Sequence, residues 1–310
     1  MIRIGKYDVV LTYSPIAEIT GHLFECFDYY LFLRNYYRVG ILFLDSLNER
    51  QVETAFESKY IFEYADIKDD ITYVSRDELK QTTIISFDKN AVVLLTDGNI
   101  KSLEHRKIVL ATTKLYGFMC GDYEFHLMHT NKNITYLQDY RIYGRNSNFR
   151  SYNYVKKLPF KYYRKSTKKF DNTGLMYVTY ACRKVTPMVI DEYHRMSGCS
   201  KSLLVVPYKL PEYDYIDNVE QVLAPLPDFF DRFDTYIYTP VHRKFDCSPR
   251  LVTECFLQNK KIFLHLDYMD IGLETRYNDC KNNFETLNLT EDDAILDIIE
   301  RARTCELATP

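Results

Sequence analysis

The sequence predicts an α/β protein of two Rossmann-like domains that face a central cleft. Near the amino end, a strand at residues 6–13, a polar loop, a helix at 23–37 and an apolar strand at 39–44 follow one another. This order, with buried strands, is how an open parallel sheet begins. Residues 234–265 repeat the order strand, polar loop, helix and strand. A length of 310 residues allows two domains that each bury a core.

The first domain is expected to extend over residues 1–140. The loop 14–22 follows its opening strand and would lie at the carboxyl end of that strand, where ligands bind in such sheets. No Gly-x-Gly-x-x-Gly fingerprint of a dinucleotide site is present. Short apolar runs predict further strands at residues 83–87, 91–96, 107–113 and 134–137.

A basic segment, residues 141–170, separates the two domains. It contains ten Lys or Arg residues and no acidic residue, with Tyr and Phe interleaved, whereas the rest of the chain carries 30 basic against 43 acidic residues. Basic side chains neutralise phosphates and aromatic rings stack on bases, so this composition suits a nucleic acid. A solvated interdomain linker would have the same composition. The candidate nucleic-acid-binding residues are Arg145, Arg150, Lys156, Lys157, Lys161 and Arg164.

The second domain is expected over residues 171–286, and a C-terminal helix within residues 287–310. A strand at 174–181, a helix at 189–196 and a strand at 202–206 open this domain. The C-terminal helix begins with an acidic turn, which the helix dipole favours.

Residues 234–265 carry the clearest candidate site. A short strand leads into a helix that Ser248 is suited to cap and Pro249 to begin. The amino end of such a helix presents free amides and a positive dipole end, which suits phosphate. Arg250 adds positive charge in the first turn, and Glu254, one turn further, can accept a hydrogen bond from a sugar hydroxyl. Alternatively, these two residues are an ordinary surface pair four positions apart.

Composition excludes several other classes of protein. The eight cysteines show neither a metal-ligand spacing nor a disulfide framework, so we expect reduced thiols and a cytoplasmic protein. No cleavable signal is expected, and charged residues interrupt the most apolar stretch, 23–44, so we expect no membrane span. His126 and His129 have no third ligand nearby, which favours packing over a metal site.

The order Ser-Pro-Arg-Leu-Val-Thr-Glu-Cys, followed by a spacer and a strand, resembles the nucleotide-sugar-binding unit of GT-B glycosyltransferases. The resemblance covers residues 234–265, and it departs from the family at 258–260, where a Gly is common. It implies that Ser248 and Arg250 bind the donor diphosphate and that Glu254 binds the donor ribose.

The same resemblance implies two further features. GT-B enzymes frequently place an Arg and a Lys after the first strand of the donor domain, where this chain has Arg183 and Lys184, directly adjacent. Such cations and a helix amino end stabilise the leaving diphosphate, so no cofactor or metal is expected beside a nucleotide-sugar donor, most simply a UDP-sugar. GT-B chains also often end on a helix that returns to the first domain.

The acceptor is expected to bind to the first domain. Glu18, His22 and Asp97 are alternative general bases for its hydroxyl, and each is equally a loop cap or turn residue. With the basic segment, the chain resembles phage DNA glycosyltransferases, which implies modified cytosine or a related base in duplex DNA as acceptor. The alternatives are a glycan, lipid or protein acceptor, or a non-catalytic nucleotide- or nucleic-acid-binding protein on the same fold. The sugar, the nucleotide, the stereochemistry and the oligomeric state stay open.

Overall fold

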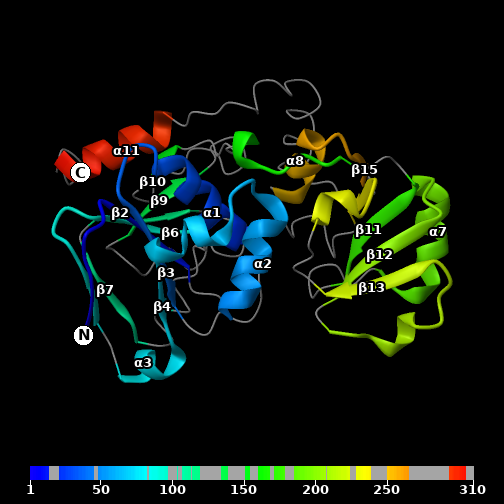
Figure 1. Cartoon of the computed structure of the whole chain (residues 1–310), viewed down its shortest axis with the longest axis horizontal. Coiled ribbons are helices and arrows are strands. Elements are labelled where there is room, and N and C mark those ends of the chain that lie inside the picture. Colours follow the sequence, from blue (N-terminus) through cyan, green and yellow to red (C-terminus); the bar gives the residue numbers. More distant parts are fainter. Residues whose placement is uncertain are drawn as a thin grey trace. The chain divides into compact units, whose positions relative to one another are not determined.

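The computed structural model describes the chain as two compact units. Unit 1 contains Met1–Val52, Phe62–Tyr162 and Leu289–Pro310, and unit 2 contains Glu53–Ile61 and Tyr163–Asn288. Figure 1 labels their helices and strands where there is room. The described residues are 1–13, 21–44, 48–81, 84–96, 103, 107–112, 114–118, 134–138, 151–153, 160–167, 171–178, 185–206, 208–223, 228–238, 250–264 and 293–304.

Unit 1 is built on a seven-stranded parallel sheet. Its strands are β2 (Val9–Tyr13), β3 (Val39–Leu44), β4 (Ile71–Val74), β6 (Val92–Leu95), β8 (Leu115–Phe118), β9 (Ile134–Gln138) and β10 (Ser151–Asn153). Their order is β10-β9-β8-β6-β2-β3-β4. The chain runs from β2 outward to β4, then crosses to β6 and runs outward to β10. This doubly wound order confirms the predicted Rossmann-like domain.

The centre of this sheet is buried on both faces. Every residue of β2, β3 and β6 is buried, as expected for the continuous apolar runs of a covered parallel sheet. Helix α1 (Gly21–Leu33) packs on β2 and β3. Helix α2 (Glu49–Lys59), which the sequence analysis did not identify, begins in unit 1 and ends in unit 2. Helix α3 (Arg76–Gln81) is a short connection before the next strand.

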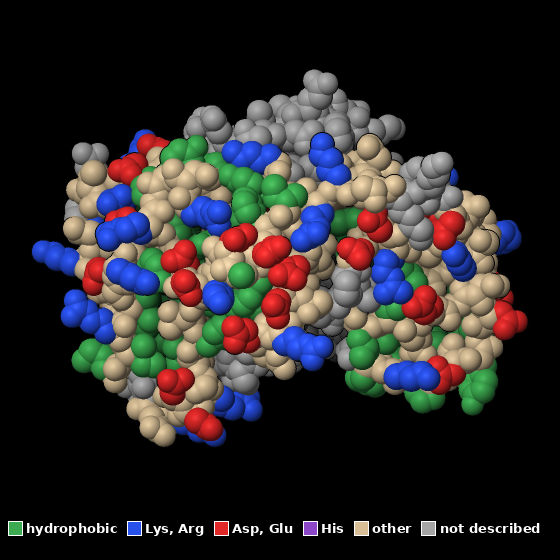
Figure 2. Space-filling view, in the orientation of Figure 1, with side chains coloured by type: hydrophobic (Ala, Val, Ile, Leu, Met, Phe, Trp, Pro, Cys, Tyr) green, Lys and Arg blue, Asp and Glu red, His purple; other side chains and the backbone are tan. Residues whose placement is uncertain are grey.

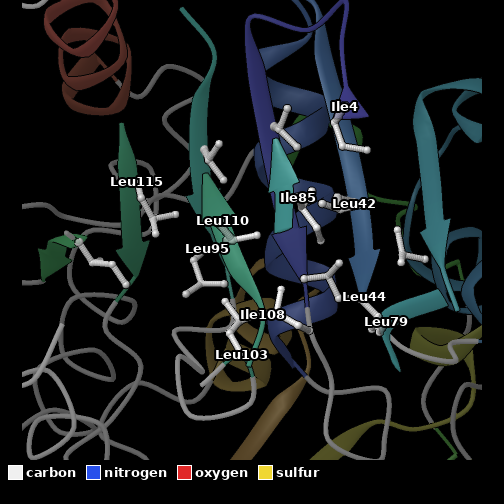
Figure 3. Packing of buried hydrophobic residues seen from close by; sticks show 14 of the residues in the cluster. Ile4, Leu42, Leu44, Leu79, Ile85, Leu95, Leu103, Ile108, Leu110 and Leu115 are labelled. Atoms are coloured by element: carbon white, nitrogen blue, oxygen red, sulfur yellow. The ribbon is translucent and has the colours of Figure 1, made fainter. Parts of the chain in front are cut away.

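A second, three-stranded parallel sheet belongs to unit 1. It contains β1 (Ile2–Ile4), β5 (Ile84–Phe87) and β7 (Val109–Ala111) in the order β1-β5-β7. Its buried residues Ile4, Ile85 and Leu110 share one core cluster with Leu42 and Leu95 of the large sheet (Figure 3). The sequence predicted strands near 83–87 and 107–113, and the structure assigns them to this separate sheet.

The C-terminal helix α11 (Asp293–Thr304) belongs to unit 1, as the fold prediction expected. Arg303 pairs with Asp8 at 3.3 Å, and Tyr37 donates a hydrogen bond to Glu300 at 2.7 Å. Lys114 Nζ donates to the Arg303 carbonyl oxygen at 3.2 Å, which satisfies a carbonyl in the last turn of the helix. Polar contacts at its carboxyl end therefore attach α11 to the sheet.

Unit 2 is built on a five-stranded parallel sheet. Its strands are β11 (Thr173–Tyr177), β12 (Lys201–Val206), β13 (Val219–Leu223), β14 (Thr235–Tyr238) and β15 (Lys261–Leu264). The order is β13-β12-β11-β14-β15, so the chain again starts in the middle and reverses direction between β11 and β14. The second Rossmann-like sheet is therefore also confirmed.

Helix α7 (Pro187–Ser197) and helix α8 (Arg250–Leu257) connect strands of unit 2. Pro187 begins α7, and Gly198, with φ of 76°, ends it in the left-handed conformation that glycine adopts without steric cost. Among the described apolar residues of unit 2, one cluster contains Val252 and Cys255 of α8 and another contains Ile190 of α7. Within the described residues, no helix has the length and apolar character that a membrane span requires.

Candidate functional site

The strand order of unit 2 defines where a ligand is expected to bind. In open parallel sheets, ligands bind beyond the carboxyl ends of the strands, at the point where the strand order reverses. In unit 2 this point lies between β11 and β14. Helix α8 follows β14, so its amino end, at Arg250, lies on the same edge of the sheet. The connection 239–249, which contains the predicted cap Ser248, lies outside the described residues.

Glu254 is fully buried between two cations. Its Oε2 accepts a hydrogen bond from Lys59 Nζ at 2.6 Å, and its Oε1 accepts one from Arg250 Nε. The side chains of Lys59, Arg250 and Glu254 are 8%, 9% and 0% exposed. Each carboxylate oxygen of Glu254 therefore has an ion-pair partner from the same unit.

Two tyrosines also contact Arg250. Its Nη2 donates to the hydroxyl of Tyr163 and lies 3.4 Å from the hydroxyl of Tyr60. The rings of Tyr60 and Tyr163 are 5.1 Å apart between centroids, and their backbones form an antiparallel bridge. The guanidinium is thus held by a carboxylate and by phenol hydroxyls.

Lys59 reaches this cluster from the last position of α2, in a segment, 53–61, that belongs to unit 2. Its backbone is held by Arg164, whose amide donates to the Lys59 carbonyl at 2.8 Å and whose Nε donates to the Tyr60 carbonyl at 2.5 Å. The ammonium also lies 5.6 Å from the ring centroid of Phe229, a cation–π distance. We call Lys59, Tyr60, Tyr163, Arg250 and Glu254 the α8 cluster.

Counted over its five described residues, the α8 cluster has a formal charge of +1, since Lys59 and Arg250 are cations and Glu254 is a carboxylate. Burial by itself raises the pKa of Glu254, but the neighbouring Lys59 and Arg250 charges outweigh it and hold that pKa below its ordinary value. Glu254 is therefore ionised at neutral pH. A net positive cluster in the first turns of a helix adds to the positive end of the helix dipole, and together they favour an anion at this edge of the sheet.

The end of the predicted basic segment is part of unit 2. Gln258 accepts a hydrogen bond from the Ser166 amide at 2.9 Å and donates one to the Arg164 carbonyl at 2.6 Å. Lys260 Nζ donates to Ser166 Oγ at 2.9 Å, and Asp231 accepts from the same hydroxyl at 2.8 Å. Arg164, predicted to bind nucleic acid, thus has a structural role in binding the 53–61 segment.

In unit 1, the candidate general bases follow two adjacent strands. The amide and Oγ1 of Thr96, just after β6, donate to the Thr12 carbonyl of β2 at 3.0 and 2.9 Å. His22 is the second residue of α1, after β2, and is half-buried. Glu18 lies in the connection before it and Asp97 directly follows Thr96, and both lie outside the described residues. In sequence, Glu18 and Asp97 thus belong to the connections that follow β2 and β6, and His22 belongs to the first turn of the helix that follows β2.

Most of the other predicted residues also lie outside the described part of the chain. Lys161 is described and exposed, with its ammonium 4.9 Å from the ring centroid of Tyr162. Those outside are Arg145, Arg150, Lys156, Lys157, Arg183, Lys184, Ser248, His126 and His129. Among the side chains that the structure describes, no group of three or more His, Cys, Asp or Glu is arranged to hold a metal ion.

Sequence reasoning missed Lys59, Tyr60 and Tyr163. Lys59 is 195 positions from Glu254, and nothing in the local pattern of α2 distinguishes it from the solvent-facing charges of the same helix. The one available signal was the α8 sequence itself, because a Glu on the buried side of a helix requires a cation from elsewhere in the fold.

A separate polar cavity of about 390 Å³ lies at the amino ends of β11, β12 and β13. Among its charged side chains, Lys201 pairs with Asp171 at 2.8 Å and Arg232 with Glu220 at 2.9 Å, and Asp231 accepts hydrogen bonds from Ser166 and Thr167. It occupies the opposite edge of the sheet from α8, away from the carboxyl ends of the strands where ligands bind in such sheets, so it is the weaker candidate.

No protein-family model and no curated protein matches the chain. Among solved structures, HepE of Anabaena in complex with UDP and glucose is similar at 8% identity and a TM-score of 0.48, over 99% of this chain and 100% of that one. An alpha-glucosyltransferase in complex with UDP is similar at 11% identity and a TM-score of 0.46, over 96% and 94% of the two chains.

The alpha-glucosyltransferase bound to UDP and a 13-mer DNA with a central A:G mismatch is similar at 12% identity and a TM-score of 0.43, over 96% of this chain and 94% of that one. These values describe distant likenesses. The assignment of two Rossmann-like sheets therefore rests on the strand orders of the chain itself.

Proposed function

We propose that the chain is a glycosyltransferase that moves a sugar from a nucleoside diphosphate to a hydroxyl acceptor. The observation that supports this most directly is the α8 cluster. It combines a net charge of +1 with the amino end of a helix, on the sheet edge where Rossmann-like folds bind phosphates.

The chemistry requires stabilisation of the leaving diphosphate. Negative charge develops on it as the bond to the sugar breaks, and preorganised cations lower the energy of that state. In the proposal, Arg250 supplies one such charge from the first turn of α8. Ser248, Arg183 and Lys184 are proposed to complete the phosphate site, as the GT-B resemblance implies.

The acceptor hydroxyl is proposed to lose its proton to Glu18, His22 or Asp97 of unit 1. The hydrogen bonds between Thr12 and Thr96 support this, because they join the carboxyl ends of the two strands that these residues follow. A side chain there would lie at the reversal of strand order in unit 1, between β2 and β6. A general base that reaches the hydroxyl contributes about a hundredfold or more.

The proposed acceptor is a modified cytosine or related base in duplex DNA, and this part rests on the composition of residues 141–170. On the face shown in Figure 2, lysines and arginines are interspersed with acidic side chains, so the described part of that face has no concentrated positive patch. Binding would therefore depend on the basic segment, above all on its exposed cations such as Lys161.

The donor test measures thermal shifts of the full chain with UDP-glucose, GDP-mannose, ADP-glucose and dTDP-glucose, because a ligand that binds only the folded state stabilises it. Transfer of labelled sugar from the donor that binds is then measured into hydroxymethylcytosine duplex DNA, unmodified duplex DNA, and separate glycan, lipid and protein pools. Label in the first pool alone supports the DNA proposal. Label in another pool would identify a different class of acceptor. Donor binding without transfer to any pool would indicate a non-catalytic protein.

Arg250 is tested beside a matched arginine of the same unit. Arg250→Ala is expected to lower transfer about a hundredfold. Arg232→Ala removes an arginine that pairs with Glu220 at the other sheet edge, and it should leave transfer unchanged. Equal activities of the two variants would contradict the proposed phosphate site.

DNA binding is tested by gel shift at several salt concentrations. Lys156, Lys157 and Lys161 are changed together to Ala, and Arg164 is left intact because it binds the Tyr60 carbonyl. The control changes three exposed lysines of unit 1, Lys68, Lys80 and Lys89. The salt slope should fall by roughly one for each lost phosphate contact in the first variant and stay unchanged in the control. Salt-independent binding, or none, would end the DNA proposal.

A further inference from the structure

We propose that Lys59 is a positioning residue of the donor site, which through Glu254 sets the orientation of the Arg250 guanidinium at the start of α8. Glu254 then serves as the link between two cations and not as the ligand of the donor ribose. This inference rests on the proposed function, because it concerns how the phosphate site is held.

The first step is the occupancy of the carboxylate. Lys59 Nζ lies 2.6 Å from Glu254 Oε2, and Arg250 Nε binds the other oxygen. The Glu254 side chain is completely buried. A ribose hydroxyl would have to reach a completely buried carboxylate whose two oxygens each already bind a cation, so the ion pairs satisfy the buried charge without a ligand.

The second step is the rigidity of the lysine. Lys59 ends an α-helix, and its carbonyl accepts the Arg164 amide at 2.8 Å. Arg164 Nε binds the next carbonyl along the chain, that of Tyr60, at 2.5 Å. The lysine is therefore attached to a fixed backbone, and its ammonium defines where the Glu254 carboxylate lies.

The third step is that Lys59 and Tyr60, which are adjacent in the chain, support Arg250 from two directions. Lys59 acts through Glu254 on the Nε side of the guanidinium, and the Tyr60 hydroxyl lies 3.4 Å from Nη2, beside the Tyr163 hydroxyl. A guanidinium binds phosphate best when its planar fork is preorganised. The segment 53–61, outside the α8 sequence, thus supplies that preorganisation.

The fourth step is charge. Without Lys59, the cluster falls from a net +1 to zero, and Glu254 is compensated by Arg250 alone. A unit charge about 10 Å from a phosphate, at an effective dielectric constant of about 20, changes affinity on the order of tenfold. Loss of orientation adds to this, so charge and geometry need to be separated experimentally.

The experiment titrates UDP, 2′-deoxy-UDP and uridine into the intact chain by calorimetry. Lys59→Met should weaken UDP binding on the order of tenfold and change uridine binding little, since uridine has no phosphate. Lys59→Arg should retain UDP affinity within about threefold, since it restores the charge to the same carboxylate. The matched control is Lys260→Met, which removes a buried lysine that binds Ser166 Oγ and the Phe233 carbonyl, each at 2.9 Å, and has no bond to Glu254.

Lys59→Met with Glu254→Gln separates orientation from charge. This double variant has a net charge of +1 again and no uncompensated carboxylate, so it is also the variant that folds most securely. Positioning predicts that its UDP affinity stays low. Full recovery of UDP affinity would show that Lys59 acts by charge alone and would overturn the proposal, as would UDP binding by Lys59→Met at the level of Lys260→Met.

Glu254→Gln alone tests the rival role. If Glu254 is the link, UDP and 2′-deoxy-UDP weaken by the same factor. If UDP weakens and 2′-deoxy-UDP does not, Glu254 is the ribose ligand and the inference is wrong. If the wild-type chain binds none of UDP, GDP, ADP or dTDP, the proposed function itself fails, and the inference fails with it. Binding by the wild type with no effect of Lys59→Met overturns the inference alone.

Discussion

Replacing Lys59 by Met should destabilise unit 2 by about 3 kcal/mol, because it breaks a buried ion pair and leaves the carboxylate with one partner. The pair joins side chains that are 8% and 0% exposed, at 2.6 Å. Removing one partner of a buried ion pair costs about 3 to 5 kcal/mol of stability. The lower value is expected here because Glu254 keeps its contact with Arg250. The exposed comparison in the same unit is Lys209→Met, whose partner Asp214 is 3.2 Å away and whose pair has side chains that are 73% and 37% exposed. That change should cost at most about 1 kcal/mol.

The assay is hydrogen exchange in increasing urea, followed on peptides from β11 and β14, because the chain has no Trp and its two units need not unfold together. With a urea dependence of about 1 to 3 kcal/mol/M, Lys59→Met should lower the midpoint of these peptides by about 1 M or more. A loss of stability no larger than that of Lys209→Met would refute the reasoning.

The stability of unit 2, followed on the same peptides, should decrease at acid pH. The folded-state pKa of Glu254 lies below its ordinary value of 4.5, since the Lys59 and Arg250 charges outweigh burial, which raises it. The stability that this group contributes is therefore fully present above pH 4.5 and is lost as the pH falls through the lower folded-state pKa. Glu254→Gln should reduce the loss of unit 2 stability at acid pH. An unchanged dependence of stability on acid pH would contradict the assignment of this loss to Glu254.

Three further outcomes are expected. Burial holds the pKa of His194 below its ordinary 6.5, against a smaller opposing effect of Asp191, so unit 2 should lose stability as the pH falls below 6.5, and His194→Gln should remove that loss in denaturation at pH 5 and 7. Arg303→Ala should raise hydrogen exchange in α11 by an amount equivalent to about 1 kcal/mol, whereas Arg301→Ala, which removes an exposed pair within the helix, should not. Cys255 is fully buried and its pKa is raised by burial, so iodoacetamide should label it only after unfolding, as mass spectrometry would detect.

Much of the fold follows from local sequence. The apolar runs that became β2, β3 and β14 are buried along their whole length, which is a property of each segment and needs no knowledge of its partners. Helix α8 begins at Arg250, directly after the Ser-Pro that predicted a helix start. The C-terminal helix likewise carries its buried stripe, Ile295, Ile298, Ile299 and Ala302, in its own periodicity.

Other features required the tertiary structure. The segments 84–87 and 109–111 can be predicted as strands from their own sequences. Their membership of a second sheet depends on pairing, because the first pairs with Ile2–Ile4, more than eighty positions away, and the second pairs with the first. Helix α2 is mainly polar, so its pattern did not reveal that its last turn is buried in unit 2.

The α8 cluster separates the contribution of local sequence from that of the fold. The sequence determined that Arg250 and Glu254 lie one turn apart on a helix after a strand, and this suggested a site for phosphate and ribose. The fold decided that Lys59 and Tyr163 meet them, and that Glu254 is buried and doubly paired. Periodicity reports which side of a helix is apolar, whereas the partner of a buried charge is selected by packing between segments that are distant in the chain.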